Sequence, residues 1–208
     1  LLQCRCVLFF SENKFKAKKF IVYFQSFTNT YAPLSTLKSL YEKALSFDDV
    51  IGLSIGTRTD CVTDEILDFL YEKSKQKEIW IEYGIQSFFQ TTLDKINRAD
   101  DVENMRYWIR RTKEKGLNVC GHLIYGLPDE NQEMMLETFK QTIDLKVDSI
   151  KFHPLYVVKN TLLTNEFKKG RFTPISEDLY IDTVVKSIVN LPQNVSVQRV
   201  TAGIDDDT

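Results

Sequence analysis

Six short apolar runs, separated by amphipathic stretches, constrain the fold of this 208-residue chain more than any other feature. Each run is nearly continuously apolar and rich in β-branched and aromatic residues, which indicates strands buried on both faces of a parallel sheet. Repeated strand–helix units predict an α/β fold, either a (β/α) barrel or an open doubly wound sheet. The runs cover residues 20–24, 50–55, 79–83, 117–125, 147–152 and 195–200.

The stretches between the runs predict crossover helices with recognisable ends. Pro33 or Ser35 opens a helix that extends to Ser46, and Thr63 is expected to cap the next one. Asp100 or Asp101 is expected to begin a third helix, which Gly116 closes. Two further helices are predicted over residues 132–145 and 175–190, and an irregular segment over residues 156–161.

Composition excludes several classes of protein. The chain is 43% hydrophobic and carries a net charge of −2, so neither disorder nor bulk electrostatic binding to nucleic acid is indicated. No apolar run approaches the roughly 18 residues needed to span a bilayer, and we find no signal-peptide cleavage pattern. Four cysteines are few for a disulfide scaffold of this size, which favours the reducing cytoplasm. A first residue other than Met suggests a fragment or a processed segment.

Polar residues concentrate after the carboxyl ends of the predicted strands. Parallel strands end at one edge of a sheet or barrel, where ligands bind, so these side chains are expected to converge on one mouth. For each of them a structural role is the alternative: Arg58 can pair with Asp60, His122 can be a satisfied core group, and Lys159 a solvated loop residue. The expected mouth residues are Gln25, Ser26, Thr28, Asn29, Thr57, Arg58, Glu82, Gln86, His122, Lys151 and His153.

The stretch from Trp80 to Arg98 is the most suggestive of these strand ends. Gln86 can both donate and accept hydrogen bonds, and Arg98 is a permanent cation with a planar fork that suits a carboxylate. No glycine-rich dinucleotide fingerprint or phosphate-binding loop follows any strand, which disfavours a Rossmann-type nucleotide domain. The sequence thus predicts a grip for a small polar ligand.

Four segments, taken together, closely resemble the radical S-adenosylmethionine (radical SAM) superfamily. Within the superfamily, the chain is most similar to the bacterial group related to the radical domain of the Elongator catalytic subunit (Elp3-like). The resemblance covers residues 19–201, preceded by an atypical segment, residues 1–18, and followed by an acidic tail, residues 202–208. The four segments occur in the family's order and are residues 24–33, 54–60, 82–87 and 123–128.

The resemblance implies a partial TIM-type (β/α)6 barrel that reductively cleaves S-adenosylmethionine at a 4Fe–4S cluster to a 5′-deoxyadenosyl radical. It places the loop of residues 25–30 where the family receives the methionine amino group. Gln86 and Arg98 match positions that contact S-adenosylmethionine in the related oxygen-independent coproporphyrinogen oxidase. The turn Tyr125, Gly126 and Leu127 matches one near the adenine, whereas His122 replaces an aspartate of that relative, which puts a ribose contact in doubt.

The cysteines depart from the family pattern. Three closely spaced cysteines normally hold the cluster through thiolates, and this chain has only Cys4, Cys6, Cys61 and Cys120. We therefore expect the family's first strand and cluster loop to be absent, because either the chain is truncated or residues have been left out of the printed sequence. No metal ligands are assigned, and as printed the chain is expected to be inactive.

Two functions stay open from the sequence, with a third less favoured. One is a radical SAM core whose cluster segment is absent, with an electron donor such as flavodoxin or ferredoxin. Another is a non-catalytic barrel that binds a nucleotide-like ligand or a partner. A barrel hydrolase or aldolase using Lys151 and His153 is disfavoured by the lack of paired carboxylates or a metal triad. A basic run is compatible with an RNA contact, although a solvated surface is favoured: Lys14, Lys16, Lys18 and Lys19.

Overall fold

A computed structural model of the protein describes residues 16–201 and shows one curled sheet of six parallel strands. The strand order follows the chain without exchange, from β1 at one edge to β6 at the other. The predicted α/β fold and partial barrel are therefore confirmed. The strands are β1 (Phe20–Phe24), β2 (Val50–Thr57), β3 (Glu78–Gln86), β4 (Asn118–Tyr125), β5 (Ser149–Pro154) and β6 (Ser196–Arg199).

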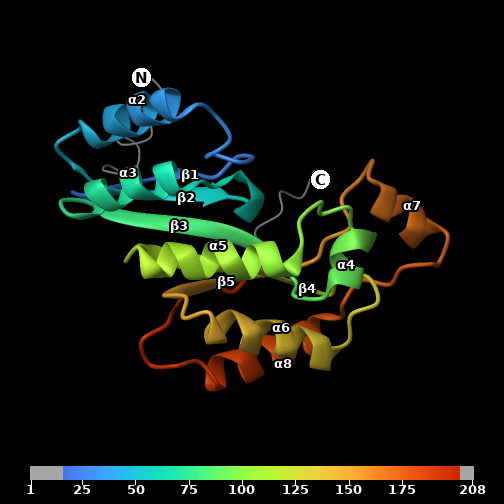
Figure 1. Ribbon diagram of the computed structural model, residues 1–208. Coiled ribbons are helices and arrows are strands. Elements are labelled where there is room, and N and C mark those ends of the chain that lie inside the picture. Colours follow the sequence, from blue (N-terminus) through green and yellow to red (C-terminus); the bar gives the residue numbers. More distant parts are fainter. Residues whose placement is uncertain (1–15, 202–208) are drawn as a thin grey trace.

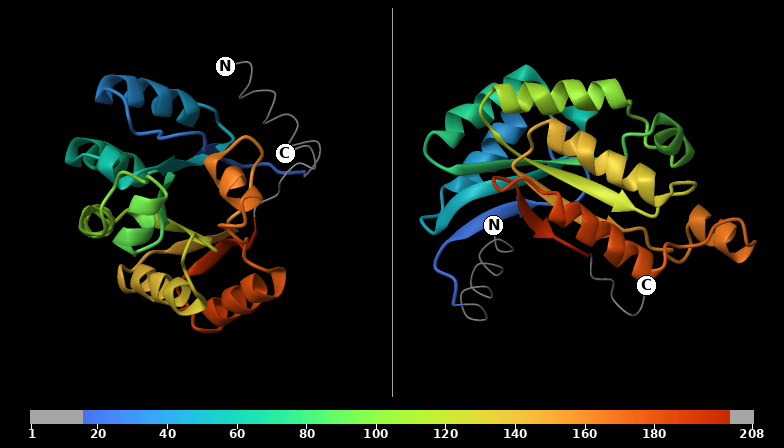
Figure 2. Two further views of the ribbon diagram at one scale, coloured as in Figure 1. Left: turned by 90° about the vertical axis from the view of Figure 1, so that its right-hand side faces the viewer. Right: turned by 90° about the horizontal axis from the view of Figure 1, so that it is seen from below.

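Helices cover the outer face of this sheet and leave its inner face to form the mouth. Figure 1 shows the sheet between α2 and α3 on one side and α6 and α8 on the other, and Figure 2 shows the helices arranged in an arc around the strands. None of the helices within residues 16–201 combines the length and the apolar character needed to cross a membrane. The helical elements are α2 (Leu34–Leu45), η1 (Thr59–Cys61), α3 (Asp64–Ser74), α4 (Gln90–Lys95), α5 (Val102–Glu114), α6 (Gln132–Asp144), α7 (Leu162–Lys168) and α8 (Glu177–Val189).

The predicted helix starts at Thr63 and Asp101 are confirmed. Thr63 Oγ1 accepts a hydrogen bond from the backbone N–H of Ile66, and Asp101 Oδ1 accepts one from that of Asn104 at 2.7 Å. Each cap satisfies a backbone donor that the first helical turn leaves free. The structure differs from the prediction in two ways: β2, β3 and β5 continue to Thr57, Gln86 and Pro154, and η1 and α7 were not predicted.

The two faces of the sheet differ because side chains alternate along each strand. One face packs its branched and aromatic residues against the helices and forms the core, for example Ile81, Leu123 and Phe152. The opposite face carries small and polar residues at matching heights across neighbouring strands. Gly56 pairs with Glu82 and Glu82 with Cys120 in one row, and His122 pairs with Lys151 and Lys151 with Arg199 in the next.

Residues 1–15 and 202–208 lie outside the described residues. The predicted atypical N-terminal segment therefore falls almost entirely outside them, and the predicted acidic tail does so completely. The segment 156–161 is irregular, as predicted, and leads directly into α7.

Candidate functional site

The carboxyl ends of the strands surround a cavity of about 370 Å³, which we call the mouth cavity. Predicted site residues reach it from the loop after β1, from β2, β3 and β4 and their following loops. They are Gln25, Thr28, Thr57, Arg58, Glu82, Gln86, Arg98 and His122. Of the two β5 residues, His153 lines the cavity, and Lys151 contacts Glu82 on its floor.

Glu82 is the centre of a buried polar network on the floor of the mouth. Its side chain is only 2% exposed, and one carboxylate oxygen lies 2.6 Å from His122 Nε2 and 2.5 Å from Lys151 Nζ. The other oxygen accepts a hydrogen bond from Ser54 Oγ. Burial by itself would raise the pKa of Glu82, but the hydrogen bonds from His122, Lys151 and Ser54 outweigh it and lower the pKa to about 2.

Lys151, the ion-pair partner of Glu82, is also buried. Its side chain is 7% exposed, and its ammonium lies 4.4 Å from the centroid of the Tyr23 ring. Burial, followed by the nearby Glu82 carboxylate, raises the pKa of Tyr23, so this phenol stays protonated. Glu82 and Lys151 thus form a buried ion pair in which each charge offsets the cost of burying the other.

Arg98 is held at the rim by backbone that adopts unusual conformations. Its neighbours Asn97 and Ala99 both have left-handed backbone, with φ of 52° and 51°, and Gln86 has φ of 67°. Such positions are costly for residues other than glycine and concentrate at functional sites. One guanidinium nitrogen of Arg98 donates to the Gly84 carbonyl oxygen at 2.7 Å, while its Nε has no hydrogen-bond partner among the described residues.

Arg58 has a partner, as the structural alternative proposed. Its guanidinium forms a bidentate pair with the Asp60 carboxylate, with Nε 2.7 Å from Oδ1, and also donates to the Ala99 carbonyl oxygen at 2.8 Å. The hydrogen bond to Arg58 is the main reason that the pKa of Asp60 is lowered. Arg58 therefore fixes the loop that carries Arg98 and brings no unpaired charge to the cavity.

Some residues of the loop after β1 line the mouth cavity, and others hold the loop in place. Asn29 does not line the cavity; its Nδ2 donates to the carbonyl oxygens of Phe24 and Gly56, both at 2.9 Å, and so fastens the loop to β2. Thr57 Oγ1 lies 2.5 Å from Thr30 Oγ1 and extends this fastening. Ser26 is exposed outside the cavity, whereas Phe27, which the sequence did not single out, lies at the rim and is 99% exposed.

The turn after β4 does not reach the mouth cavity. Tyr125 is buried in the core, where its hydroxyl lies 2.8 Å from Ser187 Oγ. Gly126 and Leu127 line a separate hollow of about 400 Å³ together with Arg171. The mouth also receives His153, as expected, and three residues that were not among the predicted site residues: Tyr23, Gly84 and Arg199. Alternation along β5 and β6 is the signal by which His153 and Arg199 belong to the inner face.

Two cysteines lie within the described residues, and they are not neighbours in the fold. Cys61 ends η1, and Cys120 is buried on the inner face of β4. Burial, then the charge on Glu82, raises the pKa of the Cys120 thiol to about 12. Ligand atoms of Glu82, Cys120 and His122 come within 4.8 Å of one another, but Lys151 occupies the Glu82 oxygen that a metal ion would need. We therefore assign Glu82 and His122 to the ion-pair network, beside which Cys120 is a buried, protonated thiol.

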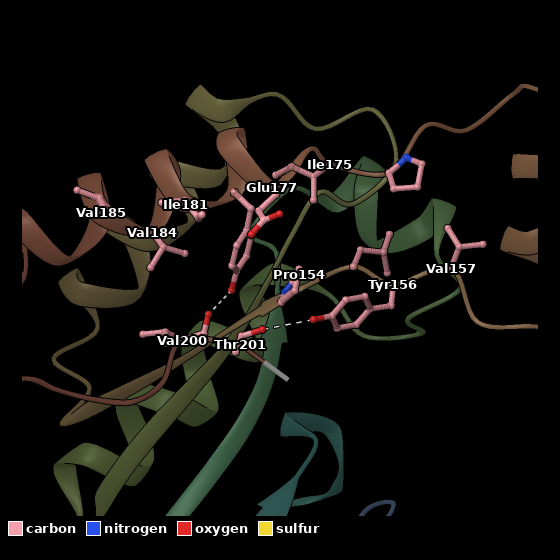
Figure 3. A pocket seen from close by; sticks show the side chains of 13 residues that line it. Pro154, Tyr156, Val157, Ile175, Glu177, Ile181, Val184, Val185, Val200 and Thr201 are labelled. Carbon is pink, nitrogen blue, oxygen red and sulfur yellow. Dashed lines mark hydrogen bonds between the residues drawn. The ribbon is translucent and has the colours of Figure 1, made fainter. Parts of the chain in front are cut away.

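A second, larger hollow of about 790 Å³ lies between α8, the end of β6 and the chain that follows β5; we call it the α8 groove (Figure 3). Apolar side chains line most of it, including Val157, Ile181 and Val184. Its hydroxyl groups have partners: Tyr180 donates to the Val200 carbonyl oxygen at 2.6 Å, and Tyr156 lies 3.3 Å from Thr201 (Figure 3). The α8 groove is thus mainly apolar, in contrast to the mouth cavity.

Comparison with curated proteins identifies relatives that align with most of this chain. The chain is 39% identical over 190 residues to the uncharacterized protein YtqA of Bacillus subtilis, a match that covers 91% of this chain and 59% of that protein. It is 41% identical over 192 residues to the uncharacterized protein MJ0486 of Methanocaldococcus jannaschii, covering 92% and 60%. The chain therefore spans about three fifths of the length of these relatives.

Structural comparison supports the same grouping at the level of the fold. The structure of the archaeal Elp3 of Methanocaldococcus infernus, with an N-terminal deletion, superposes with a TM-score of 0.83 at 21% identity, covering 98% of this chain and 53% of that one. Residues 10–142 match the family model described as "Radical SAM superfamily", and residues 147–208 match the "Radical_SAM C-terminal domain". The chain belongs to the radical SAM superfamily.

Proposed function

We propose that the chain is the S-adenosylmethionine-binding core of a radical SAM enzyme, with the mouth cavity as the binding site. The observation that carries this proposal is the Arg98 guanidinium, which is half-buried at the rim and has an unpaired buried Nε. A buried polar atom without a partner is rare in proteins and calls for a ligand. A guanidinium binds a carboxylate through two parallel hydrogen bonds, and the methionine portion of S-adenosylmethionine supplies a carboxylate.

The space around Arg98 also fits this molecule. A Cβ atom on Gly84 would come within 2.8 Å of Gln86 Nε2 and 3.2 Å of the Arg98 guanidinium, so glycine keeps the space in front of these two side chains open. Gln86 can then donate to one end of the ligand and accept from another. The cavity volume is within the range usual for small-molecule sites.

Each group in the mouth has a role in this proposal. Arg98 holds the methionine carboxylate, and Gln25 with Thr28 receives the ammonium group, as the loop after β1 does in the family. His122 is oriented by Glu82, to which it is hydrogen-bonded, and faces the ribose. Gly126 and Leu127 remain proposed neighbours of the adenine, although they line the adjacent hollow. When bound, S-adenosylmethionine supplies the carbon–sulfur bond whose reductive cleavage gives the 5′-deoxyadenosyl radical.

The described residues do not fit a 4Fe–4S cluster. Three thiolates are required to hold one, and residues 16–201 offer Cys61 and the buried, protonated Cys120. The proposal for this chain therefore concerns binding of S-adenosylmethionine. Radical cleavage, an electron donor such as flavodoxin or ferredoxin, an RNA substrate and a cytoplasmic location are proposals for a protein that carries the cluster.

Isothermal titration calorimetry of the chain with S-adenosylmethionine tests the proposal. Arg98→Ala is expected to weaken binding by about tenfold to a hundredfold, because a hydrogen-bonded charge contributes about 1.5–3 kcal/mol. Arg111→Ala is the matched control, since Arg111 pairs with Asp64 on the outer helices. Equal affinity of the wild type and Arg98→Ala would overturn the assignment of the carboxylate to Arg98, and no binding by the wild type would overturn the proposal.

A non-catalytic barrel that binds the same nucleotide-like ligand is the second candidate, favoured by the pair of distant cysteines in the described residues. Anaerobic reconstitution with iron and sulfide, followed by visible absorption and electron paramagnetic resonance, separates the two functions. A cluster signal from this chain would exclude the non-catalytic reading. Ligand binding without a cluster signal would support it for the chain as printed.

A further inference from the structure

Two guanidinium groups of the mouth cavity, one after β3 and one on β6, form no ion pair within residues 16–201. Arg58 pairs with Asp60 and Lys151 with Glu82, so these four charges cancel. Arg98 and Arg199 also line the cavity. No carboxylate among the described residues forms an ion pair with either of them, and no described group accepts a hydrogen bond from Arg199.

Arg199 extends a row of basic groups across three strands. In the register of the sheet, His122 on β4 pairs with Lys151 on β5, and Lys151 pairs with Arg199 on β6. His153 lies two residues beyond Lys151, on the same face of β5, with its ring 5.5 Å from that of His122. Among residues 16–201, Glu82 is the carboxylate hydrogen-bonded to this group, and it is already shared by His122 and Lys151.

His153 is a second unsatisfied group on this side. Its Nε2 is buried and has no hydrogen-bond partner among the described residues. Burial lowers its pKa to about 4, with further lowering from His122, Arg199 and Lys151 against a smaller opposing effect of Glu82. His153 is therefore a neutral imidazole at pH 7, in a region whose summed charge is positive.

We propose that Arg199 and His153 form a second anion-binding subsite, which takes a carboxylate or phosphate group of the substrate that shares the mouth cavity with S-adenosylmethionine. The inference rests on the proposed function in one respect. S-adenosylmethionine has a single carboxylate, assigned to Arg98, and its sulfonium and ammonium groups are repelled by the uncompensated charge of Arg199. The second anion therefore belongs to a different molecule. A guanidinium beside a neutral imidazole N–H is suitable chemistry for either anion.

Nuclear magnetic resonance of the histidine side chains tests the subsite directly. The chain has two histidines, His122 and His153, so a 15N-histidine sample gives two sets of ring signals, which His153→Gln assigns. At pH 7, inorganic phosphate is expected to shift the His153 signals saturably. Arg199→Gln is expected to weaken this response at least tenfold, and Arg199→Lys to keep part of it because a point charge remains. An acetate titration shows whether the subsite prefers the carboxylate.

One control variant locates the response. Arg111→Gln is expected to leave the phosphate response unchanged, since Arg111 pairs with Asp64 on the outer helices. A saturable response to either anion that depends on Arg199 supports the subsite. The inference is overturned if neither phosphate nor acetate gives saturation, or if Arg199→Gln, folded by circular dichroism, responds like the wild type.

Calorimetry with S-adenosylmethionine on the same samples distinguishes this inference from the proposed function. If S-adenosylmethionine binds but no anion reaches His153, the subsite fails and the proposed function stands. If the anion response is present but S-adenosylmethionine does not bind, the proposed function fails and the anion subsite stands, without its assigned companion in the cavity.

Discussion

The mouth cavity and the α8 groove are built by neighbouring residues of the same two strands. His153 and Arg199 line the mouth, whereas the next residues along the chain, Pro154 and Val200, line the groove. Alternation along β5 and β6 thus separates a polar hollow from an apolar one. The groove has about twice the volume of the mouth, yet its hydroxyl groups are paired, while the mouth keeps unpaired nitrogen atoms on Arg98 and His153.

Under the proposed function, unsatisfied polar groups distinguish the binding site from the larger groove better than volume does. Leaving a buried donor without a partner costs about 1–3 kcal/mol, so a fold that keeps two such groups at one mouth gives up stability there. The groove is stabilised by ordinary packing and carries no such cost. The following variants test whether the two regions differ in this way.

The largest effect is expected for Glu82→Ala on the floor of the mouth. The substitution leaves the buried Lys151 ammonium without its carboxylate and removes the acceptor of Ser54 and His122. We expect the free energy of unfolding to fall by about 3–5 kcal/mol, as for other broken buried ion pairs. Urea denaturation followed by circular dichroism measures it.

Glu177→Ala in the α8 groove is the matched control for Glu82→Ala. Glu177 is exposed in the first turn of α8, so its loss is expected to cost less than about 1 kcal/mol, mainly through the helix dipole. Similar losses for the two variants would show that the Glu82 network is not the buried, compensated cluster that separates the mouth from the groove.

Below pH 6.5, residues of the mouth cavity are expected to make the free energy of unfolding depend on pH, whereas residues of the α8 groove are not. The pKa of His153 is about 4 in the folded protein and about 6.5 when unfolded, so between these values the unfolded chain binds more protons and stability falls as the pH is lowered. The loss attributable to His153 is about 3 kcal/mol from pH 6.5 to 4. Glu82 adds its own loss only below pH 4.5, toward its folded value of about 2.

His153→Gln should flatten the stability profile between pH 6.5 and 4 and leave the steep fall below pH 4.5. Urea unfolding at several pH values gives both profiles. Parallel slopes for the wild type and the variant across the upper window would contradict the buried, neutral imidazole and would weaken the contrast between the mouth and the groove.

A smaller effect is expected for Tyr180→Phe in the α8 groove. The substitution removes the hydrogen bond from the Tyr180 hydroxyl to the Val200 carbonyl oxygen and keeps the ring in place. We expect a loss of about 1 kcal/mol in the free energy of unfolding, typical of one such bond. Calorimetric binding of S-adenosylmethionine should not change; a weakened affinity would mean that the groove and the mouth are coupled.

Local sequence signals were sufficient for most of the fold. Apolar runs located all six strands, and the oxygen-bearing side chains of Thr63 and Asp101 located two helix starts. Helix α7 escaped prediction because seven residues, Leu162–Lys168, are too few to show a helical period. Its cap, Thr161, which accepts from the Thr164 N–H, was the available signal.

The candidate site was less predictable, because it depends on contacts between distant segments. Strand ends predicted Glu82, Gln86 and His122 in the mouth, since every parallel strand ends there. Gly126 was expected beside them, but it lines another hollow. Its φ is +86°, and a Cβ atom at this position would come within 2.7 Å of Ile175, so the turn packs against the segment before α8. Arg199 was missed because the face on which a four-residue strand presents each side chain depends on its register with β5.

The smallest effect on stability is expected for substitutions on the exposed face of α8. Ile181, Val185 and Val189 follow one another at four-residue intervals and are 50%, 51% and 77% exposed. Because about half of its side chain is already exposed, Val185→Ser should lower the free energy of unfolding by no more than about 1 kcal/mol. Exposed apolar patches bind hydrophobic dyes, so fluorescence of 8-anilinonaphthalene-1-sulfonate should fall in Ile181→Ser/Val185→Ser. Unchanged dye fluorescence would contradict the prediction that these side chains form the apolar surface to which the dye binds.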